Sequence, residues 1–297
     1  MTEPCGIIPV FKPEGWTSFD VIAKLRGILH MKRLGHAGTL DPMATGVLPV
    51  FVGKATKACD ILPDSDKAYE AGFTLGITTD TQDVSGKTLS ESDGRGIPRE
   101  TVEDKLKAFR GEIMQIPPMY SAVKVGGKRL YDLAREGKEI EREPRRITVY
   151  ELSLTDFDEA AGTGKLYISC SKGTYIRTII HDLGQALGCG AAMNGLSRVR
   201  AAGFTLEDCV TMEQLAEMPL EKALMPLINA FEGYTKITLD EHCTAMYKNG
   251  VKLWCEQASI DKSFDKEFCV IGRDGAFLGL AKVVQAEGVI KAVRNFY

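Results

Sequence analysis

The chain is organised around one stretch, GHAGTLDPMATGVLPVFVG (residues 35–53), in which a loop rich in glycine and threonine runs into a short apolar segment. An apolar run of this length with β-branched residues is typical of a buried strand, and Pro49 predicts that the strand is interrupted or lies at a sheet edge. Within the loop, Pro42 restrains the backbone of Asp41 to extended conformations, while glycines such as Gly38 allow close approach of another backbone or a ligand. The stretch therefore predicts a strand preceded by an aspartate in a glycine-lined loop.

Helices and strands are both expected on either side of this loop. Thr17 or Ser18 can cap a helix whose apolar stripe includes Phe19 and ends near Gly35. Apolar residues at helical spacing also occur in residues 102–109, 129–137, 174–188 and 210–218, and apolar or alternating runs predict strands over residues 67–76, 145–154 and 165–172. Residues 78–97 are dense in Thr, Asp, Ser and Gly and predict an exposed loop. Because helices and strands do not alternate regularly, the pattern favours an α+β fold over a doubly wound sheet.

The acidic segment before residue 235 is a plausible domain boundary. Between residues 206 and 241, eight acidic residues face only two basic ones. Beyond it, FCVIGRDGAFLGLAKV (residues 268–283) has two apolar runs around Asp274-Gly275, which is a strong hairpin signal, and VIKAVRNFY (residues 289–297) predicts a last strand. We therefore expect a division into residues 1–234 and 235–297, with a small β-rich second domain.

Composition and charge exclude several classes of protein. The chain has 297 residues, of which 44% are hydrophobic and 26% charged, so a disordered or fibrous protein is excluded. The first residues lack a signal-peptide pattern, and no run approaches the roughly 18 apolar residues needed to span a bilayer, so a cytoplasmic protein without a membrane partner is expected. A net charge of −3 argues against indiscriminate coating of nucleic acid.

Basic residues are nevertheless concentrated in two segments. Residues 120–150 contain eight basic and five acidic residues, and residues 170–200 contain four basic residues and one acidic residue. A local basic surface is one interpretation, and solvated helix faces are the other.

Sequence signals for metals and cofactors are missing. The eight cysteines are scattered without a CxxC pair and are expected to be buried thiols, and the four histidines lack HExxH or Cys/His ligand spacing. A P-loop, a GxGxxG fingerprint and a GxSxG elbow are also missing. We therefore expect neither a metal nor a cofactor.

Asp41 is then the main candidate for chemistry. An Asp-Pro step is often a simple turn, and a nucleophilic or basic aspartate needs a partner that keeps it ionised. Arg177, near the start of a helix that follows a strand, could be this partner or a surface residue. Alternation places Tyr69 on the apolar face of its strand, where it could stack on a base or belong to the core. His36 could reach a phosphate or ribose, or could satisfy a loop hydrogen bond.

Five motifs together resemble the bacterial tRNA pseudouridine-55 synthase family, TruB. They are KPEGWTS (residues 12–18), GHAGTLDP (residues 35–42), Tyr69, QIPPMYSAVK (residues 115–124) and SKGTYIR (residues 171–177), in order within residues 5–205. The closing FLGLAKV and IKAVRNFY resemble the PUA-like RNA-binding domain of that family. The resemblance implies a pseudouridine synthase fold, with a central mixed, largely antiparallel sheet flanked by helices and loops.

The resemblance also implies an activity and its residues. The expected reaction is isomerisation of the uridine at position 55 in the T loop of tRNA, with the uracil detached, turned and rejoined through C5 after the nucleotide is flipped out. Asp41 would be the catalytic aspartate, Arg177 its ion-pair partner and Tyr69 the residue stacked on the uracil. His36 would help to displace the base, and the other substrate-binding candidates are Tyr175, Leu196, Gly38, Thr39 and Lys12.

Recognition of the T-arm stem-loop of tRNA calls for phosphate contacts as well. The candidates are Lys124, Lys128, Arg129, Lys172, Arg198 and Arg200, which we expect on the face that carries Asp41. No obligatory protein partner is evident from the sequence.

Two other classes of function stay open at this point. A glycoside hydrolase or a base-exchanging transglycosylase could use an aspartate at the same kind of bond, although a hydrolase would usually need a second carboxylate, for which the motifs offer no obvious candidate. A non-catalytic RNA-binding or RNA-folding protein could use the same pocket. Release of free uracil would indicate the hydrolase, and tRNA binding without turnover would indicate the non-catalytic protein.

Overall fold

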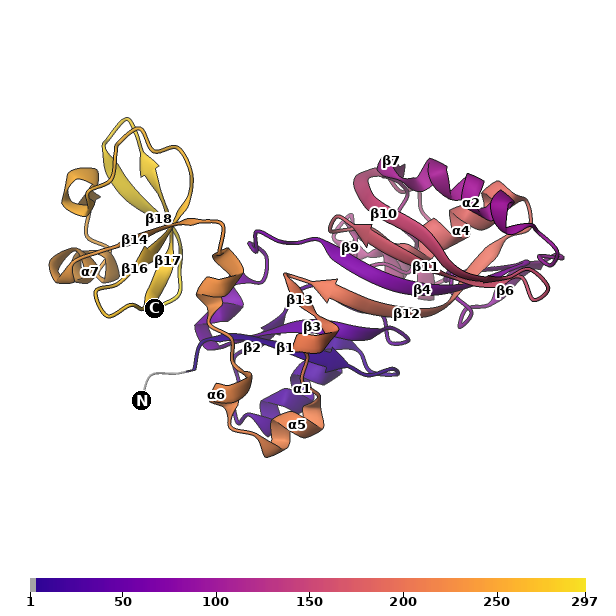
Figure 1. Ribbon diagram of the computed structural model, residues 1–297, viewed down its shortest axis with the longest axis horizontal. Helices are drawn as coiled ribbons and strands as arrows, with labels where there is room; N and C mark the ends of the chain where they lie inside the picture. Colours follow the sequence, from indigo (N-terminus) through magenta and orange to yellow (C-terminus); the bar gives the residue numbers. More distant parts are fainter. Residues whose placement is uncertain (1–3) are drawn as a thin grey trace.

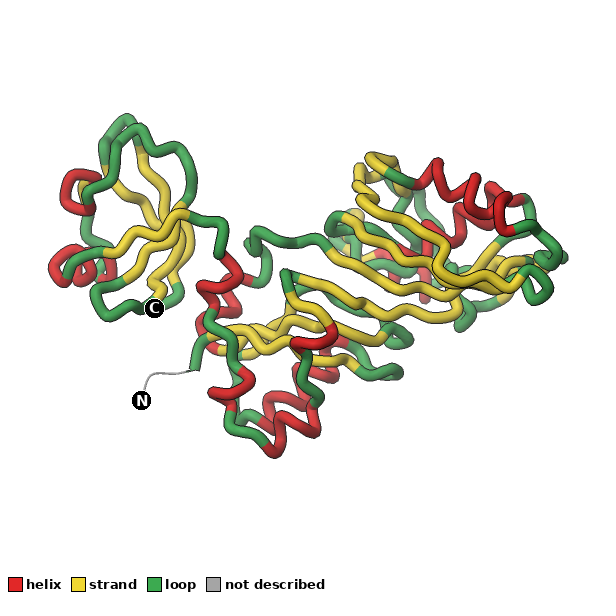
Figure 2. Tube along the Cα trace, in the orientation of Figure 1, coloured by secondary structure: helices red, strands yellow, loops and turns green. Residues whose placement is uncertain are grey.

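The computed structural model describes residues 4–297 and arranges them in two large sheets and two short hairpins, with helices around them (Figures 1 and 2). In this part of the chain the larger sheet has nine strands, in the order β1-β3-β12-β4-β11-β10-β7, with β2 beside β3 and β13 beside β12. These strands are β1 (Gly6–Lys12), β2 (Leu34–His36), β3 (Thr45–Val52), β4 (Lys67–Leu75), β7 (Gly111–Gln115), β10 (Arg145–Asp158), β11 (Thr163–Cys170), β12 (Ala191–Ala201) and β13 (Phe204–Thr205). Neighbouring strands are antiparallel except β3 and β12. The mixed sheet confirms the predicted α+β class.

Five of the helices in the described residues form close to where apolar spacing predicts them, whereas the helices of residues 220–223 and 241–248 were not predicted. The helices are α1 (Ser18–Ile28), α2 (Arg99–Leu106), α3 (Leu130–Arg135), α4 (Ile176–Leu187), α5 (Met212–Glu217), α6 (Leu220–Ala223) and α7 (Glu241–Lys248). Thr17 caps α1 in a capping box with Asp20, and the left-handed Gly188 (φ 78°) ends α4. Two expectations were wrong, because α1 already ends at Ile28 and Phe19 on it is 65% exposed.

The larger sheet is packed by two separate hydrophobic cores. Helices α2 and α4 cover β4, β10, β11 and β12, with Phe73, Leu166 and Ile180 in the first core. Helices α1 and α5 pack on β1 and β3, with Leu25 and Val50 in the second core. The two groups of helices lie at different ends of the sheet in Figure 1. Leu40 and Ala44, in the loop of residues 37–44, belong to the first core.

Strand β3 is an interior strand, so the prediction of an edge at Pro49 was wrong. Strand β1 pairs with one side of β3, while β12 and β2 pair with the other side. Pro49 lies opposite Pro9 in a pair that makes no hydrogen bond across β1 and β3, because the carbonyl of Pro9 accepts instead from the N–H of Val210 at 3.0 Å. Neither proline therefore removes a hydrogen bond between these strands. The carbonyl of Pro49 still accepts from the N–H of Ala37 at 3.1 Å. Register thus allows proline inside the sheet.

Residues 78–97 are not a simple exposed loop. Strands β5 (Ile77–Thr79) and β6 (Thr88–Glu91) form a hairpin, and Thr79 and Asp83 are buried between its ends. The hydroxyl of Thr79 donates to the carbonyl of Asp83 at 2.7 Å. Internal hydrogen bonds therefore allow Thr79 and Asp83 to be buried, while most residues from 84 to 96 are exposed as composition predicts.

The C-terminal residues form a second sheet with its own core. Its strands are β14 (Thr235–Thr238), β15 (Leu253–Trp254), β16 (Phe268–Ile271), β17 (Phe277–Val284) and β18 (Val289–Asn295), in the order β14-β16-β17-β18-β15. The predicted hairpin is confirmed, because β16 and β17 pair around Gly275 (φ 80°). Phe231 packs against Phe277 and Phe296 and joins this sheet to the rest. The β-rich sheet fits the expected PUA-like domain, while the division at residue 234 stays a prediction.

Smaller elements complete the described chain. Strands β8 (Lys124–Val125) and β9 (Lys128–Arg129) form a short hairpin, and 3₁₀ helices cover Gly53–Ala58, Lys107–Phe109, Leu206–Asp208, Leu227–Phe231 and Cys255–Ala258. Four cysteines are buried as expected (Cys170, Cys243, Cys255 and Cys269), and the other four are half-buried. None of the helices in residues 4–297 is long and apolar enough to cross a bilayer.

Candidate active site

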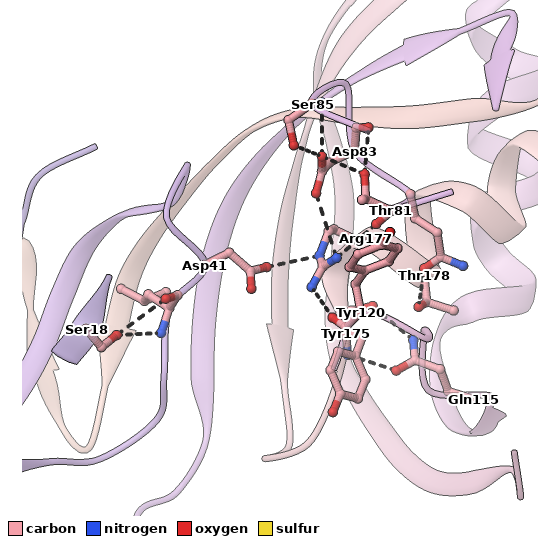
Figure 3. Close-up of polar contacts among 12 residues, drawn as sticks. Ser18, Asp41, Thr81, Asp83, Ser85, Gln115, Tyr120, Tyr175, Arg177 and Thr178 are labelled. Carbon is pink, nitrogen blue, oxygen red and sulfur yellow. Dashed lines mark hydrogen bonds and ion pairs between the residues drawn. The ribbon is translucent and has the colours of Figure 1, made fainter. Parts of the chain in front are cut away.

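The carboxylate of Asp41 lies against the guanidinium of Arg177 (Figure 3). Nε of Arg177 is 3.0 Å from Oδ2 of Asp41, and the arginine side chain is 7% exposed whereas that of Asp41 is 39% exposed. Arg177 belongs to the first turn of α4, directly after β11, so its side chain reaches the loop that carries Asp41. The pair therefore exposes the carboxylate of Asp41 to solvent while a buried arginine holds it from behind.

The guanidinium is itself held on several sides. Its Nη1 donates to the carbonyl of Thr81 at 2.9 Å, and its Nη2 donates to the carbonyl of Tyr120 at 3.0 Å. A planar guanidinium is preorganised for such contacts, so each hydrogen bond costs it little conformational freedom. Because Arg177 is fixed in this way, it also fixes the orientation of the Asp41 carboxylate that it binds.

A second carboxylate, Asp83, faces Arg177 from another direction (Figure 3). Its Oδ2 is 3.7 Å from Nη1 of Arg177, and its side chain is only 8% exposed. Its Oδ1 accepts from the hydroxyl of Thr81 at 2.9 Å, and from the backbone N–H (3.0 Å) and hydroxyl (2.5 Å) of Ser85. Asp83 was not among the predicted site residues. The Asp-x-Ser spacing is a signal for this turn, but it carries no information on burial.

Hydrogen bonds from the segment of residues 12–18 hold the loop that carries Asp41. The hydroxyl of Ser18 accepts from the N–H of Leu40 at 2.9 Å, and the N–H of Gly15 donates to the carbonyl of Pro42 at 2.8 Å. The ammonium of Lys12 donates to three carbonyls, those of Pro13 (3.0 Å), Trp16 (2.5 Å) and Pro42 (3.2 Å). The motif therefore acts as a clamp on the residue that follows Asp41.

Lys12 does not contact solvent, so the expectation that it binds substrate was wrong. Its side chain is fully buried, and burial lowers the pKa of Lys12 to about 8 because a desolvated ammonium is disfavoured. All three N–H groups of the ammonium donate to backbone carbonyls, those of Pro13 and Trp16 in its own segment and that of Pro42 in the loop. Its role is therefore structural support of the site.

Arg198 is also buried, which overturns its assignment as a phosphate contact. It is 0% exposed, its Nε donates to the carbonyl of Val47 at 2.8 Å, and its Nη2 donates to the carbonyl of Gly38 at 2.9 Å. On the neighbouring strand Tyr69 lies in register with Arg198 and is 7% exposed. Burial raises the pKa of Tyr69 to about 12, which keeps its hydroxyl protonated. Tyr69 points inward as predicted, and only a small part of it is open to a ligand.

Tyr175 stands immediately before α4 and is positioned through its backbone. Gln115, 3% exposed at the end of β7, accepts from the N–H of Tyr175 at 2.8 Å and donates to its carbonyl at 3.1 Å. The side chain of Tyr175 is half-buried and lies close to Arg177 and Tyr120 in Figure 3. Leu196, on β12, is half-buried beside the first core. Gln115 was part of a quoted motif, but its clamp on Tyr175 could not be inferred without the distance between them.

The residues before Asp41 are more open. Gly38 and Thr39 are exposed, and Gly38 has a φ of +71°, which favours glycine. His36, at the end of β2, is half-buried, and burial together with nearby Arg198 lowers its pKa, so it is neutral at neutral pH. Its Nδ1 is buried without a hydrogen-bond partner within residues 4–297.

The other basic candidates differ in accessibility. Lys124, Lys128 and Arg129 are exposed on the β8–β9 hairpin, which follows the Tyr120 that binds Arg177. Lys172 is exposed in the turn before Tyr175, and Arg200 is half-buried and donates to the hydroxyl of Ser169 at 3.4 Å. Their contact with phosphates stays a prediction.

Known proteins share both the sequence and the fold. The family described as TruB family pseudouridylate synthase (N terminal domain) matches residues 26–176, and the tRNA pseudouridylate synthase B C-terminal domain matches residues 177–233. The chain is 42% identical over 278 residues to tRNA pseudouridine synthase B of Clostridium perfringens (strain 13 / Type A), covering 93% of this chain and 94% of that relative. It is 46% identical over 258 residues to tRNA pseudouridine synthase B of Latilactobacillus sakei subsp. sakei (strain 23K), covering 84% and 85%.

A solved structure gives the same result for the fold. A chain of a Cbf5-Nop10-Gar1 complex superimposes with a TM-score of 0.74 at 26% identity, over 98% of this chain and 85% of that one. The fold and the matched domains define the class of the pseudouridylate synthases. Within this class, the chain belongs to the TruB family.

Proposed function

We propose that this chain isomerises a uridine of tRNA to pseudouridine, with Asp41 as the catalytic residue. Membership of the family and relatives that are named tRNA pseudouridine synthase B support the reaction and the substrate. The motifs of the sequence point further to the uridine at position 55 of the T loop. The reaction requires no energy source, because its substrate and product are isomers.

The ion pair between Asp41 and Arg177 carries the proposal. One carboxylate oxygen of Asp41 binds the buried guanidinium at 3.0 Å, and the side chain keeps 39% of its surface exposed. A carboxylate that is oriented from behind and open in front is suited to act on a substrate held before it. Breaking the glycosidic bond releases the uracil as an anion, which must turn and bond through C5 to the sugar while the C5 proton leaves. A closed pocket is needed to retain that base.

The target nucleotide must be extruded before this chemistry. Unstacking costs a few kcal/mol, and stacking of a base on an aromatic side chain contributes roughly 1–3 kcal/mol. Tyr175 is half-buried near Arg177, and Tyr69 offers the small exposed part of its ring. These rings stabilise the extruded nucleotide, together with phosphate contacts from the exposed lysine and arginine side chains of the β8–β9 hairpin.

The environment of Asp83 argues against a glycoside hydrolase. A hydrolase of that kind usually pairs two carboxylates, one of which donates or accepts a proton from the substrate or from water. Asp83 is the second carboxylate near Arg177, but it is 8% exposed and is bound by Thr81, Ser85 and Arg177. Asp83 is therefore a structural partner of Arg177. Of the two carboxylates that contact this arginine in the described chain, only Asp41 is open to a substrate.

Tritium release from tRNA labelled at C5 of uridine tests the proposal. The wild-type protein should release the label and form pseudouridine, and Asp41→Asn, which keeps the shape of the side chain, should release none while it still binds tRNA. Asp104→Asn on the exposed face of α2 is the matched control and should behave as the wild type. A tRNA with cytidine at position 55 should release no label. Free uracil in the wild-type reaction, or full activity of Asp41→Asn, would contradict the proposal.

A further inference from the structure

The turn behind Arg177 contains a residue in an unfavourable backbone conformation. Gln82 has a φ of +65° and is one of four non-glycine residues with a left-handed backbone in residues 4–297. Glycine adopts this conformation freely, and asparagine, aspartate and histidine adopt it more readily than glutamine does. A residue in such a conformation persists only where its surroundings hold it, and it often lies at a functional site. Gln82 must therefore be held by its contacts.

The backbone of Gln82 is joined to the larger sheet. Its N–H donates to the carbonyl of Thr79 at 3.3 Å, which closes the turn, and its carbonyl accepts from the N–H of Met193 at 3.1 Å. The N–H of Val84 donates back to the carbonyl of Met193 at 2.9 Å. Met193 belongs to β12 and is fully buried. The turn therefore cannot shift without breaking hydrogen bonds to an interior strand.

The side chain of Gln82 is bound by helix α4. Its Oε1 accepts from the hydroxyl of Thr178 at 2.7 Å, and Thr178 is 3% exposed. Thr178 directly follows Arg177 in the first turn of this helix (Figure 3). A buried hydroxyl needs a hydrogen-bond partner, and the glutamine oxygen that supplies it is fixed in turn. Helix α4 therefore binds the turn through two adjacent residues, Arg177 and Thr178.

The residues on either side of Gln82 both contact the guanidinium of Arg177. The carbonyl of Thr81 accepts from Nη1 at 2.9 Å, and Oδ2 of Asp83 is 3.7 Å from the same nitrogen. The peptide unit that carries the Thr81 carbonyl is planar, so the φ angle of Gln82 sets its direction relative to the residues that follow. A change of this angle would turn the carbonyl away from Asp83. The left-handed conformation is therefore what brings both groups to one nitrogen.

We propose that Gln82 is a positioning residue, which acts on the active site through the two residues beside it in the turn. The hydrogen bond from Thr178 holds Gln82 in the left-handed conformation. Thr81 and Asp83 then keep the guanidinium of Arg177 in place against the catalytic carboxylate. The proposal rests on the proposed function, because turnover is its readout. It deepens that function by extending the support of the arginine to a side chain that takes no part in the chemistry.

Single-turnover tritium release and tRNA binding test the two ends of this hydrogen bond. Gln82→Met and Thr178→Val keep the size of each side chain and remove the acceptor or the donor. Each should lower the rate of release by about tenfold at an unchanged Kd, less than the order of 100-fold for a displacement of about 1 Å, because the ion pair with the catalytic carboxylate remains. The double variant should also be slower by only about tenfold, because the same bond is lost in all three proteins. Thr178→Ser, which keeps the hydroxyl, should release the label at the wild-type rate.

Glycine at position 82 separates positioning from stability. Gln82→Gly adopts a φ of +65° without strain, so its melting temperature should equal or exceed that of Gln82→Met. It still lacks the acceptor for the Thr178 hydroxyl, so its rate of release should be about tenfold below that of the wild type. If the turn served only the stability of the fold, every variant that is folded at the assay temperature would release the label at the wild-type rate.

The controls repeat the two substitutions at exposed positions. Gln185→Met on α4 and Thr101→Val on α2 should match the wild type in every measurement. A thermal melt checks that each protein is folded, and Thr178→Val tests the bond from its other side even where Gln82→Met does not fold.

The outcomes separate the inference from the proposed function. Wild-type release by folded Gln82→Met or Gln82→Gly would overturn the positioning role, and so would losses in Gln82→Met and Thr178→Val that multiply in the double variant. A raised Kd in place of a lowered rate would overturn it as well, because the turn would then act on RNA binding. Absence of tritium release by the wild-type protein would instead refute the proposed function.

Discussion

Replacement of Asp83 by asparagine separates the positioning of Arg177 from the chemistry of Asp41. The change removes a charge 3.7 Å from Nη1 of Arg177, while an amide oxygen can still accept from Thr81 and Ser85. Two unit charges about 4 Å apart attract by roughly 4 kcal/mol at an effective dielectric constant of about 20. Movement of the arginine and entry of water recover part of this, so we expect the free energy of unfolding to fall by about 2 kcal/mol.

The effect on turnover should exceed the effect on binding. Arg177 would lean towards its remaining carboxylate, and a displacement of about 1 Å of a catalytic group costs on the order of 100-fold in rate. We therefore expect kcat of Asp83→Asn to fall by about that factor, with little change in the Kd for tRNA.

Single-turnover tritium release, tRNA binding and thermal melting together provide the measurement. Asp104→Asn, whose partner is the exposed Lys107, is the control and should match the wild type in all three. Wild-type kcat in a folded Asp83→Asn protein would show that the second carboxylate does not position Arg177.

Three further changes test other parts of the site. Gly38→Ala places a side chain on a backbone with φ +71° and directs it towards Lys67 and Arg198. Its melting temperature should therefore fall further than that of Gly137→Ala, where φ is +72° but the space around the glycine is open. Equal losses in the two variants would refute crowding of the Gly38 position by these two side chains. The pKa of Lys12 is lowered to about 8 in the folded chain from an ordinary value of 10.5, so between these pH values the unfolded state binds more protons than the folded state. The free energy of unfolding of the wild type should therefore rise with pH relative to that of Lys12→Met. Chemical denaturation at pH 7.5 and 10 measures this difference, and a parallel pH dependence of the two proteins would contradict the burial of the ammonium. Replacement of Lys124 and Lys128 by alanine should weaken tRNA binding and lower its salt slope by about 0.7–0.9 for each lost phosphate contact. Replacement of Lys105 at the end of α2 and Lys107 just after it should change neither quantity. An unchanged slope in the first variant would remove the hairpin from the RNA surface.

Local signals in the sequence predicted much of the fold. The Thr17 cap, the end of α4 at Gly188 and the hairpin at Gly275 each depend on residues within a few positions of each other. The pairing of Asp41 with Arg177 came from motifs that resemble a known family, since 136 positions of sequence separate the two residues and spacing alone left their contact undecided.

Burial of charge is what the sequence could not reveal. Lys12, Arg198 and Asp83 are residue types that are almost always exposed, and composition therefore placed them in solvent or on a ligand. Lys12 and Arg198 are buried with hydrogen bonds to carbonyls distant in sequence, those of Pro42 and of Val47 and Gly38, respectively. Asp83 is hydrogen-bonded by its neighbours Thr81 and Ser85, and its distant partner is the guanidinium of Arg177. Such contacts depend on the register of strands, which a local pattern does not specify.

Asp41 is attached to both hydrophobic cores of the larger sheet at once. Leu40 and Ala44, which flank it, are embedded with α4, whereas the Lys12 and Ser18 that grip its loop come from β1 and α1. Any loosening of β1 and α1 would pull the acid away from the guanidinium while the rest of the protein stayed folded. Mild warming or low denaturant should then inactivate the enzyme before it melts, and amide exchange in β1 should track the lost activity.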